Sequence, residues 1–320
     1  METDIQKLAE EIIEGRRITR GDETDFFGTA PLEELCAAAD MIREKLCGNH
    51  VDLCAIINGR SGGCSEDCKF CAQSCRHNTG VENHGFMDPE AIVADCAYHE
   101  KKGVHRYSIV TAGRTIEGED LEKACEAYRE MHERFSIGLC ASHGLLPKES
   151  FEKLKASGVS MYHENIETSR RNFPNICTTH AFDDKISGIR LAHEAGLSVC
   201  SGGIIGMGET FADRIDMALT LAEEKVESIP LNVLIPIKGT PLEALEPLTE
   251  DEVLRTIAMF RFICPAAYIR LAAGRNTMKD SGVSAFRSGA NATITGDMLT
   301  TSGNNIEQDK EMLRALGREI

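Results

Sequence analysis

The stretch "SIGLCASHGLLPKESFEKLKASGVSMYHENI", residues 136–166, contains the unit that decides the fold. Two β-rich runs, 136–142 and 159–166, flank a charged segment with helical periodicity at 147–158. This segment begins at a proline and ends at a glycine, which are common helix start and stop signals. A strand, a helix and a second strand in this order predict a βαβ unit with parallel strands.

The same alternation continues along most of the chain. Eight β-rich runs occur, at residues 51–57, 106–110, 136–142, 159–166, 197–205, 227–235, 266–272 and 292–295. Charged, helix-periodic segments separate most consecutive runs. The pattern predicts an α/β fold, a single parallel (β/α)8 barrel of the TIM type, and an open doubly wound sheet is the alternative.

The N-terminal region has a different pattern. Residues 1–48 predict two helices, split by "GDETDFF" at 21–27. No proline- or serine-rich linker divides the rest of the chain. We therefore expect one domain over residues 1–320, with N-terminal helices in 1–48 and the barrel and C-terminal segment in 49–320.

Composition and charge exclude several classes of protein. The chain has 35 basic and 51 acidic side chains, a net charge of −16, which disfavours general binding to nucleic acid. Neither a secretion signal nor an apolar run of membrane-spanning length is apparent, so we expect a cytoplasmic protein. Thirteen cysteines in a reducing compartment indicate metal binding or redox chemistry rather than structural disulfides.

Four of these cysteines, three closely spaced and then Cys75, are concentrated in "GGCSEDCKFCAQSC", residues 62–75. Cys64, Cys68 and Cys71 follow the first strand run directly, at the end of a barrel where active sites lie. A structural zinc site would need a second cysteine pair, and the polar surroundings argue against buried structural thiols. An iron–sulfur cluster suits the spacing best, with one iron left open unless Cys75 is a fourth ligand.

The loop, with Phe70 before its last cysteine, resembles that of the radical S-adenosylmethionine superfamily. In that superfamily, a 4Fe-4S cluster binds S-adenosylmethionine at its open iron and cleaves it to a 5′-deoxyadenosyl radical. The segments "VCSGGIIGMGET", "IPLNVLIPIKGTPL" and "YIRLAAGR" extend the resemblance to the biotin synthase family, over residues 20–317. The resemblance implies sulfur insertion into dethiobiotin, reduced flavodoxin or ferredoxin as electron donor, and a homodimer.

The resemblance also implies roles for polar residues after the strands. Glu167 corresponds to the acidic residue on the ribose hydroxyls of S-adenosylmethionine, and Asn165 to the asparagine between cofactor and substrate. Asn232 corresponds to the asparagine that hydrogen-bonds the ureido ring, which needs both a donor and an acceptor. Thr300 and Thr301 match a pair near the substrate carboxylate. Without the resemblance, solvated loop or capping side chains would be the simpler interpretation.

Two positions near these residues depart from the family. His163 stands where the family commonly has asparagine, and it is either a contact to the substrate ring or a satisfied core histidine. Lys185 stands where the family commonly has arginine. Its ammonium can neutralise a carboxylate of the cofactor but cannot form a bidentate pair.

The auxiliary cluster site departs further. Familiar biotin synthases bind a two-iron cluster through three strand cysteines and an arginine. Cys140, Cys200 and Arg270 match three of those positions, but the fourth is Ser108. A serine hydroxyl is a harder and far less acidic ligand than a thiolate, so the two-iron site is damaged at this position.

A different cysteine compensates for Ser108. Cys54, on the first strand, stands where familiar enzymes have serine, and Ala292 replaces another serine at the same level. Adjacent barrel strands direct inward side chains to nearby layers, so Cys54 is expected to meet Cys140 and Cys200. This set resembles the biotin synthases of anaerobes, whose auxiliary four-iron cluster carries an extra sulfide, and we favour it over a two-iron cluster. The alternative is that Cys54 is a buried core residue.

Other functions remain open from the sequence alone. The maturation enzyme of iron-only hydrogenase shares the barrel and the three-cysteine loop, and an iron–sulfur carrier is a non-enzymatic alternative. The seven remaining cysteines are assigned no ligand role: Cys36, Cys47, Cys75, Cys96, Cys125, Cys177 and Cys264.

Overall fold

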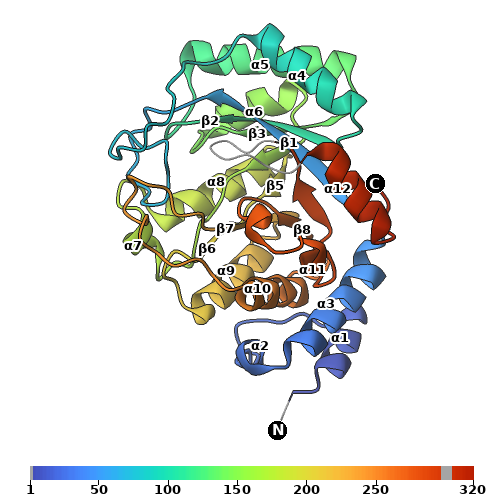
Figure 1. Cartoon of the computed structure of the whole chain (residues 1–320). Coiled ribbons are helices and arrows are strands. Elements are labelled where there is room, and N and C mark those ends of the chain that lie inside the picture. Colours follow the sequence, from blue (N-terminus) through green and yellow to red (C-terminus); the bar gives the residue numbers. More distant parts are fainter. Residues whose placement is uncertain (1–2, 297–304) are drawn as a thin grey trace.

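A computed structural model describes residues 3–296 and 305–320 of the chain and shows a closed parallel barrel (Figure 1). Its strands are β1 (Asp52–Arg60), β2 (Arg106–Thr111), β3 (Gly138–Ser142), β4 (Met161–His163), β5 (Ser198–Cys200), β6 (Gly203–Ile205), β7 (Ser228–Val233), β8 (Tyr268–Leu271) and β9 (Ala292–Ile294). Strand β1 pairs with both β2 and β9, and β5 and β6 both pair with β7, which closes the ring. The predicted barrel is confirmed.

The strand predicted at 197–205 is divided into β5 and β6 by Ser201 and Gly202. A Cβ on Gly202 would lie 2.0 Å from the carbonyl oxygen of Pro230, and one on Gly203 would lie 2.3 Å from that of Glu167. Both positions therefore require glycine, because neighbouring backbone occupies the space of a side chain. The break lets β6 form a bridge with Glu167, beyond the end of β4.

Helices surround the barrel on its outer face (Figure 1). They are α4 (Pro89–Lys101), α5 (Gly118–Arg134), α6 (Lys148–Ala156), α7 (Phe173–Ile176), α8 (Phe182–Glu194), α9 (Phe211–Glu223), α10 (Glu250–Ile263), α11 (Val283–Phe286) and α12 (Ile306–Ala315), with a 3₁₀ turn at Arg275–Thr277. Helices α9 and α10 each begin with a threonine whose side chain and a carboxylate three residues later cap the first turn. The apolar core fills the layer between helices and strands.

The N-terminal region contains one more helix than predicted. Besides α1 (Ile5–Ile13) and α3 (Leu32–Cys47), a helix of four residues, α2 (Phe26–Thr29), begins at the end of the segment expected to be a break. The ring of Phe27 is buried and meets that of Phe262 on α10 edge-on, with centroids 5.5 Å apart. Burial of this aromatic side chain explains the additional turn, which periodicity alone does not show.

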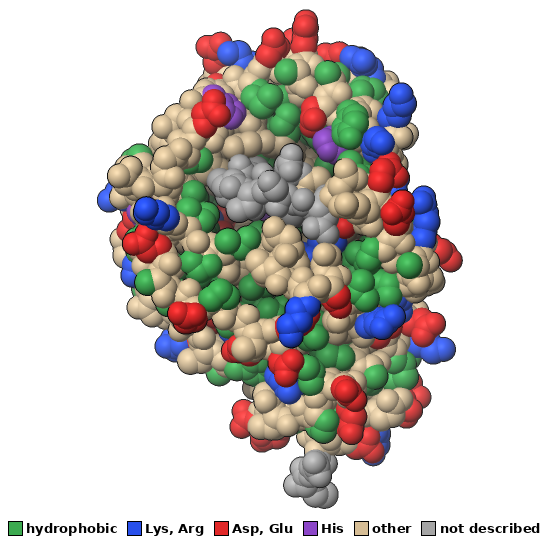
Figure 2. Space-filling model, in the orientation of Figure 1, with side chains coloured by type: hydrophobic (Ala, Val, Ile, Leu, Met, Phe, Trp, Pro, Cys, Tyr) green, Lys and Arg blue, Asp and Glu red, His purple; other side chains and the backbone are tan. Residues whose placement is uncertain are grey.

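The surface carries mixed charges. On the face drawn in Figure 2, charged side chains lie around the periphery, whereas hydrophobic and uncharged atoms surround the middle. Within residues 3–296 and 305–320, no helix combines the length and the apolar composition needed to cross a membrane.

Candidate functional site

Two adjoining cavities occupy the barrel and its rim. The larger, of about 340 Å³, extends down to the strand cysteines, and the smaller, of about 220 Å³, lies beside the loop cysteines. Phe70, Cys71, His163 and Glu167 line both. The loop and the barrel interior therefore face one continuous space.

The loop cysteines are held by backbone hydrogen bonds within their own loop. The amide of Cys64 donates to the carbonyl oxygen of Gln73 at 3.0 Å, and the amide of Cys71 donates to that of Cys68 at 2.9 Å. Cys64, Cys68 and Cys71 all line the smaller cavity. The amide of Cys75 donates to the carbonyl oxygen of Cys64 at 2.8 Å, but Cys75 is exposed and lines neither cavity.

The chemistry of the loop thiols fits a polynuclear cluster. Among the described residues, the loop cysteines do not together form a group compact enough for a single ion. A larger cluster has its ligand corners further apart and requires soft thiolates. Burial raises the pKa of Cys71 to about 11, so this thiol needs a bound metal to ionise.

Charged side chains surround the smaller cavity. The ammonium of Lys185 lies 2.5 Å from the carboxylate of Glu164. Burial disfavours the ammonium of Lys185, but Glu164 and Glu167 raise the pKa of Lys185 above its ordinary value. For Glu167, burial disfavours the charged carboxylate and so raises the pKa, and the ammonium of Lys185 opposes that rise. Lys185 thus lies at the smaller cavity, with one carboxylate partner already present.

Backbone groups orient the two predicted amides. The oxygen of Asn165 accepts from the amide of Gly202 at 3.0 Å. The oxygen of Asn232, on β7, accepts from the amide of Ala273 at 3.1 Å, and its nitrogen donates to the carbonyl oxygen of Gly203 at 3.2 Å. Both amides line the larger cavity, and each keeps unused hydrogen-bonding capacity.

His163 ends β4 at the boundary between the two cavities. Burial disfavours its protonated ring, but its hydrogen bond with Cys200 outweighs this and raises the pKa of His163. Burial alone would raise the pKa of Cys200, but the same contact lowers it. The predicted pair Thr300 and Thr301 lies outside the described residues.

The barrel interior brings together the cysteines predicted from separate strands. Cys54 on β1, Cys140 on β3 and Cys200 on β5 are all buried and line the larger cavity. Ser108 lies on β2 in register with Cys140 and lines it too. Burial raises the pKa of Cys54, and it raises that of Cys140 to about 12. Both candidates for the third ligand, Cys54 and Ser108, thus reach this space.

Two arginines make the base of the larger cavity electropositive. Arg270 on β8 lies 2.5 Å from one oxygen of Asp52, and Arg106 on β2 lies 3.1 Å from the other. Two guanidiniums share one carboxylate, so a positive charge is left facing the thiols of the cavity. Arg106 was not predicted, although its position two residues before Ser108 puts both side chains on one face of the strand. Three thiols beside this charge fit an anionic iron–sulfur cluster.

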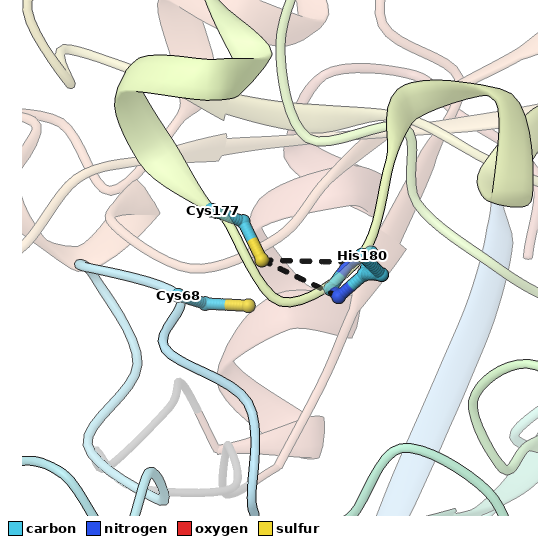
Figure 3. A group of neighbouring side chains, drawn as sticks. All are labelled: Cys68, Cys177 and His180. Atoms are coloured by element: carbon cyan, nitrogen blue, oxygen red, sulfur yellow. Dashed lines mark hydrogen bonds between the residues drawn. The ribbon is translucent and has the colours of Figure 1, made fainter.

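A second contact of the loop was also missed. Cys177 and His180, which follow α7, lie against Cys68, and the potential ligand atoms of the three residues all lie within 4.8 Å of one another (Figure 3). A hydrogen bond with Cys68, followed by one with His180, lowers the pKa of Cys177 to about 4. Cys68 and Cys177 are more than a hundred residues apart, so no local sequence signal connects them.

Comparison with protein families gives two matches. Residues 60–221 match the Radical SAM superfamily, and residues 230–319 match the Biotin and Thiamin Synthesis associated domain. The first match contains the loop cysteines, and the second contains β8, β9 and the described C-terminal helix.

Curated relatives match over nearly the whole chain. A biotin synthase of Alkaliphilus metalliredigens is 67% identical over 98% of this chain and 99% of its own length. Biotin synthases of Clostridium beijerinckii and Clostridium perfringens are 61% and 49% identical, each over 99% of this chain and at least 99% of their own lengths.

Solved structures resemble the fold at lower identity. Methylornithine synthase (PylB) matches with a TM-score of 0.83 and 21% identity, over 98% of this chain and 96% of its own. HydG, a maturase of the [FeFe]-hydrogenase, matches with a TM-score of 0.79 and 16% identity, over 99% of this chain and 75% of its own. At these identities the likeness concerns the barrel alone.

Proposed function

Because this chain belongs to the biotin synthase family of radical S-adenosylmethionine enzymes, we propose that it inserts sulfur into dethiobiotin to form biotin. The observation that best supports this is one continuous space with two separate thiol sets at its two ends. A substrate between them would meet a radical source on one side and a sulfur source on the other. The enzyme is thus a sulfurtransferase that needs both sets.

The cofactors divide the chemistry between the two ends. When bound, a loop 4Fe-4S cluster with S-adenosylmethionine supplies a 5′-deoxyadenosyl radical, and the auxiliary iron–sulfur cluster supplies sulfur. Cys64, Cys68 and Cys71 hold the loop cluster and leave one position open for S-adenosylmethionine. Apolar side chains form more than half of the lining of the larger cavity, which limits the water around the reacting carbons.

Residues around the smaller cavity bind S-adenosylmethionine in this proposal. Glu167 accepts hydrogen bonds from the ribose, and Asn165 lies between cofactor and substrate. Phe70 offers an aromatic face beside the loop cysteines, and Lys185 offers an ammonium to a carboxylate. Lys185 already pairs with Glu164, so its role is one of charge balance rather than of bidentate recognition.

Residues of the larger cavity bind dethiobiotin. Asn232 uses the donor and acceptor capacity left over from its backbone contacts to pair with the ureido ring. His163 contacts the same ring from the end of β4. The substrate carboxylate is assigned to Thr300 and Thr301 on the resemblance alone.

The auxiliary cluster is proposed to be a four-iron cluster with an exchangeable sulfide rather than a two-iron cluster. Cys54, Cys140 and Cys200 are its ligands, because iron–sulfur clusters need soft thiolates and Ser108 offers only a hydroxyl. The guanidinium of Arg270 contacts or balances the cluster from the base of the cavity.

The finer expectations about partners and organisation belong to the same proposal. We propose a cytoplasmic homodimer that receives electrons from reduced flavodoxin or ferredoxin. We also keep the division into N-terminal helices at 1–48 and the barrel with its C-terminal segment at 49–320.

Anaerobic product analysis tests the function. The purified chain, with both clusters reconstituted, is incubated with dethiobiotin, S-adenosylmethionine and a reductant, and biotin, methionine and 5′-deoxyadenosine are quantified. We expect biotin, and about eight iron atoms per chain if both clusters contain four. Formation of 5′-deoxyadenosine without consumption of dethiobiotin would indicate another radical reaction, as in a maturase. Intact S-adenosylmethionine together with cluster transfer to an acceptor protein would indicate a carrier.

A further inference from the structure

One group of potential metal ligands is formed by Cys68, a proposed ligand of the loop cluster, and by Cys177 and His180, which take no part in the reaction proposed above (Figure 3). Cys68 comes from the loop after β1, whereas Cys177 and His180 come from the segment between α7 and α8. The side chains of Cys177 and His180 are almost completely buried, and Cys68 is half-buried. Two chain segments that are distant in sequence thus converge on one small volume.

The separations within this group suit a single tetrahedral ion. The sulfur of Cys177 lies 3.8 Å from Nε2 of His180. With zinc–sulfur and zinc–nitrogen bonds of about 2.3 and about 2.0 Å, two ligands at a tetrahedral angle lie about 3.6 Å apart. The separation therefore fits, but Nδ1 of the same ring lies closer to this sulfur, at 3.3 Å, so the ring must turn to present Nε2 to a metal.

The carboxylate of Glu66 contacts one nitrogen of the His180 ring and leaves the other, Nε2, free to bind a metal. Nδ1 of His180 lies 2.6 Å from the carboxylate of Glu66, a partner that fixes the ring and its tautomer. Nε2 then keeps its lone pair for a metal, as in the carboxylate–histidine–zinc arrangement of many zinc proteins. Asp67 is excluded as a further ligand through Oδ1, because the amides of Thr178 and Thr179 already donate to that atom at 2.8 and 3.2 Å.

We propose that Cys68, Cys177 and His180 bind a zinc ion in the chain that lacks its loop cluster, with water as the fourth ligand. Two thiolates and one imidazole are a zinc-preferring set, and three protein ligands plus water are a common zinc coordination. Zinc binds both cysteines as thiolates, and any proton that either thiol still holds is released to solvent on binding.

The shared residue gives this site a consequence for assembly, which rests on the function proposed above. Cys68 cannot bind zinc and an iron of the loop cluster at once. Zinc therefore competes with the loop cluster for the chain, while Cys64 and Cys71 remain free. The auxiliary cluster does not share a ligand with the zinc site and is not affected.

Cobalt binding tests the site directly. The cluster-free full-length chain is titrated with Co²⁺, which reports thiolate ligation by charge-transfer bands and tetrahedral geometry by intense d–d bands, and zinc is then added as competitor. We expect one tetrahedral cobalt per chain that zinc displaces. Cys177→Ser and His180→Ala should each weaken cobalt binding by more than the roughly 10- to 100-fold expected for Glu66→Gln, which changes only the partner of the His180 ring.

Matched loop variants separate this inference from the proposed function. Cys64→Ala should keep the cobalt spectrum and lose loop iron, whereas Cys177→Ser should lose the cobalt spectrum and keep loop iron after reconstitution. Equal cobalt binding in Cys177→Ser and the native chain would overturn the zinc site and leave the loop cluster untouched. Loss of the spectrum in Cys64→Ala would also overturn it, since the metal would then lie among the loop cysteines.

Competition during reconstitution tests the consequence. One equivalent of zinc should slow iron incorporation at the loop of the native chain and have no effect on Cys177→Ser. Cys177→Ser and the native chain are compared by circular dichroism, so that a folding defect of the variant is recognised. Equal slowing in both chains would contradict a site that depends on Cys177.

Discussion

The two thiol sets of this barrel are built in opposite ways. The loop set lies within residues 64–71, is partly exposed, and is shaped by hydrogen bonds inside one loop. The strand set comes from Cys54, Cys140 and Cys200, is buried, and exists only when the strands are in register. The loop set can therefore form locally, whereas the strand set depends on closure of the whole barrel.

Charge separates the two regions as clearly as burial does. The smaller cavity is lined by both signs, including Glu164, Glu167 and Lys185. The base of the larger cavity presents Arg106 and Arg270, and Glu167 at its boundary is the only carboxylate among its described lining residues. Mixed charges suit the amino and carboxylate groups of one zwitterionic ligand, whereas two guanidiniums suit a cluster of thiolates and sulfides.

The largest expected effect concerns the loop set. Cys68→Ala removes one of three ligands and should abolish reductive cleavage of S-adenosylmethionine, because the cluster then keeps only two of its three thiolates. Anaerobic assay of 5′-deoxyadenosine measures this. Cys75→Ala, which changes an exposed cysteine outside both cavities, is the matched control and should be active. A normal rate in Cys68→Ala would remove this loop from the radical step.

The next effect separates the strand set from the loop set. Cys54→Ser should lose auxiliary iron and biotin formation but retain the loop cluster and cleavage of S-adenosylmethionine. Ser108→Ala, a change in the same cavity, should be nearly silent, since a hydroxyl is a poor ligand for iron–sulfur clusters. Iron analysis and Mössbauer spectra of both variants decide the assignment. Full auxiliary iron in Cys54→Ser with loss in Ser108→Ala would restore a serine-ligated site.

The charged base of the barrel predicts a stability effect. Arg270→Ala leaves the buried carboxylate of Asp52 with Arg106 as its remaining partner and should lower the free energy of unfolding by about 3 kcal/mol. Denaturant unfolding of the cluster-free chain measures it. Arg190→Ala breaks an exposed pair with Glu224 and should cost about 0–1 kcal/mol. Similar losses in both variants would mean that the base is solvated rather than buried.

The smallest effect concerns substrate recognition between the two sets. Asn232→Ala leaves the ureido group of dethiobiotin without a partner, so binding should weaken by about 1–3 kcal/mol while both clusters stay intact. Equilibrium binding to the reconstituted enzyme measures this. Asn175→Ala changes an amide that bonds Asn172 and lines neither cavity, and it should bind normally. Unchanged affinity in Asn232→Ala would remove this residue from the substrate site.

The sequence predicted the helices and strands well where neighbouring residues alone determine them. The eight β-rich runs correspond to the strands, and the loop motif lies at the rim. The break at Ser201 and Gly202 was not predicted, because the close approach of Pro230 that requires it comes from another strand. Helix α2 was missed because it is stabilised by the burial of Phe27 against α10 and not by the helix propensity of its own residues.

Like the fold, the candidate site could be predicted from the sequence only in part. The thiols of the strand set were found through resemblance and strand geometry, but Arg106 was not, since an arginine at a strand start usually indicates solvent. The contact of Cys68 with Cys177 and His180 joins segments separated by more than a hundred residues, so only folding reveals it.

Glu167 has a consequence for the thermodynamics of ligand binding. Its backbone has φ 67°, a left-handed conformation that costs a non-glycine residue about 1–3 kcal/mol. Its amide donates to the carbonyl oxygen of Gly202 at 3.1 Å, and its own carbonyl oxygen accepts from the amide of Ile204 at 2.9 Å. The strain is thus compensated during folding, before any ligand arrives. Binding of a ligand to this carboxylate costs less conformational entropy of the protein than binding that must order a mobile loop. Preorganisation at Glu167 therefore favours affinity.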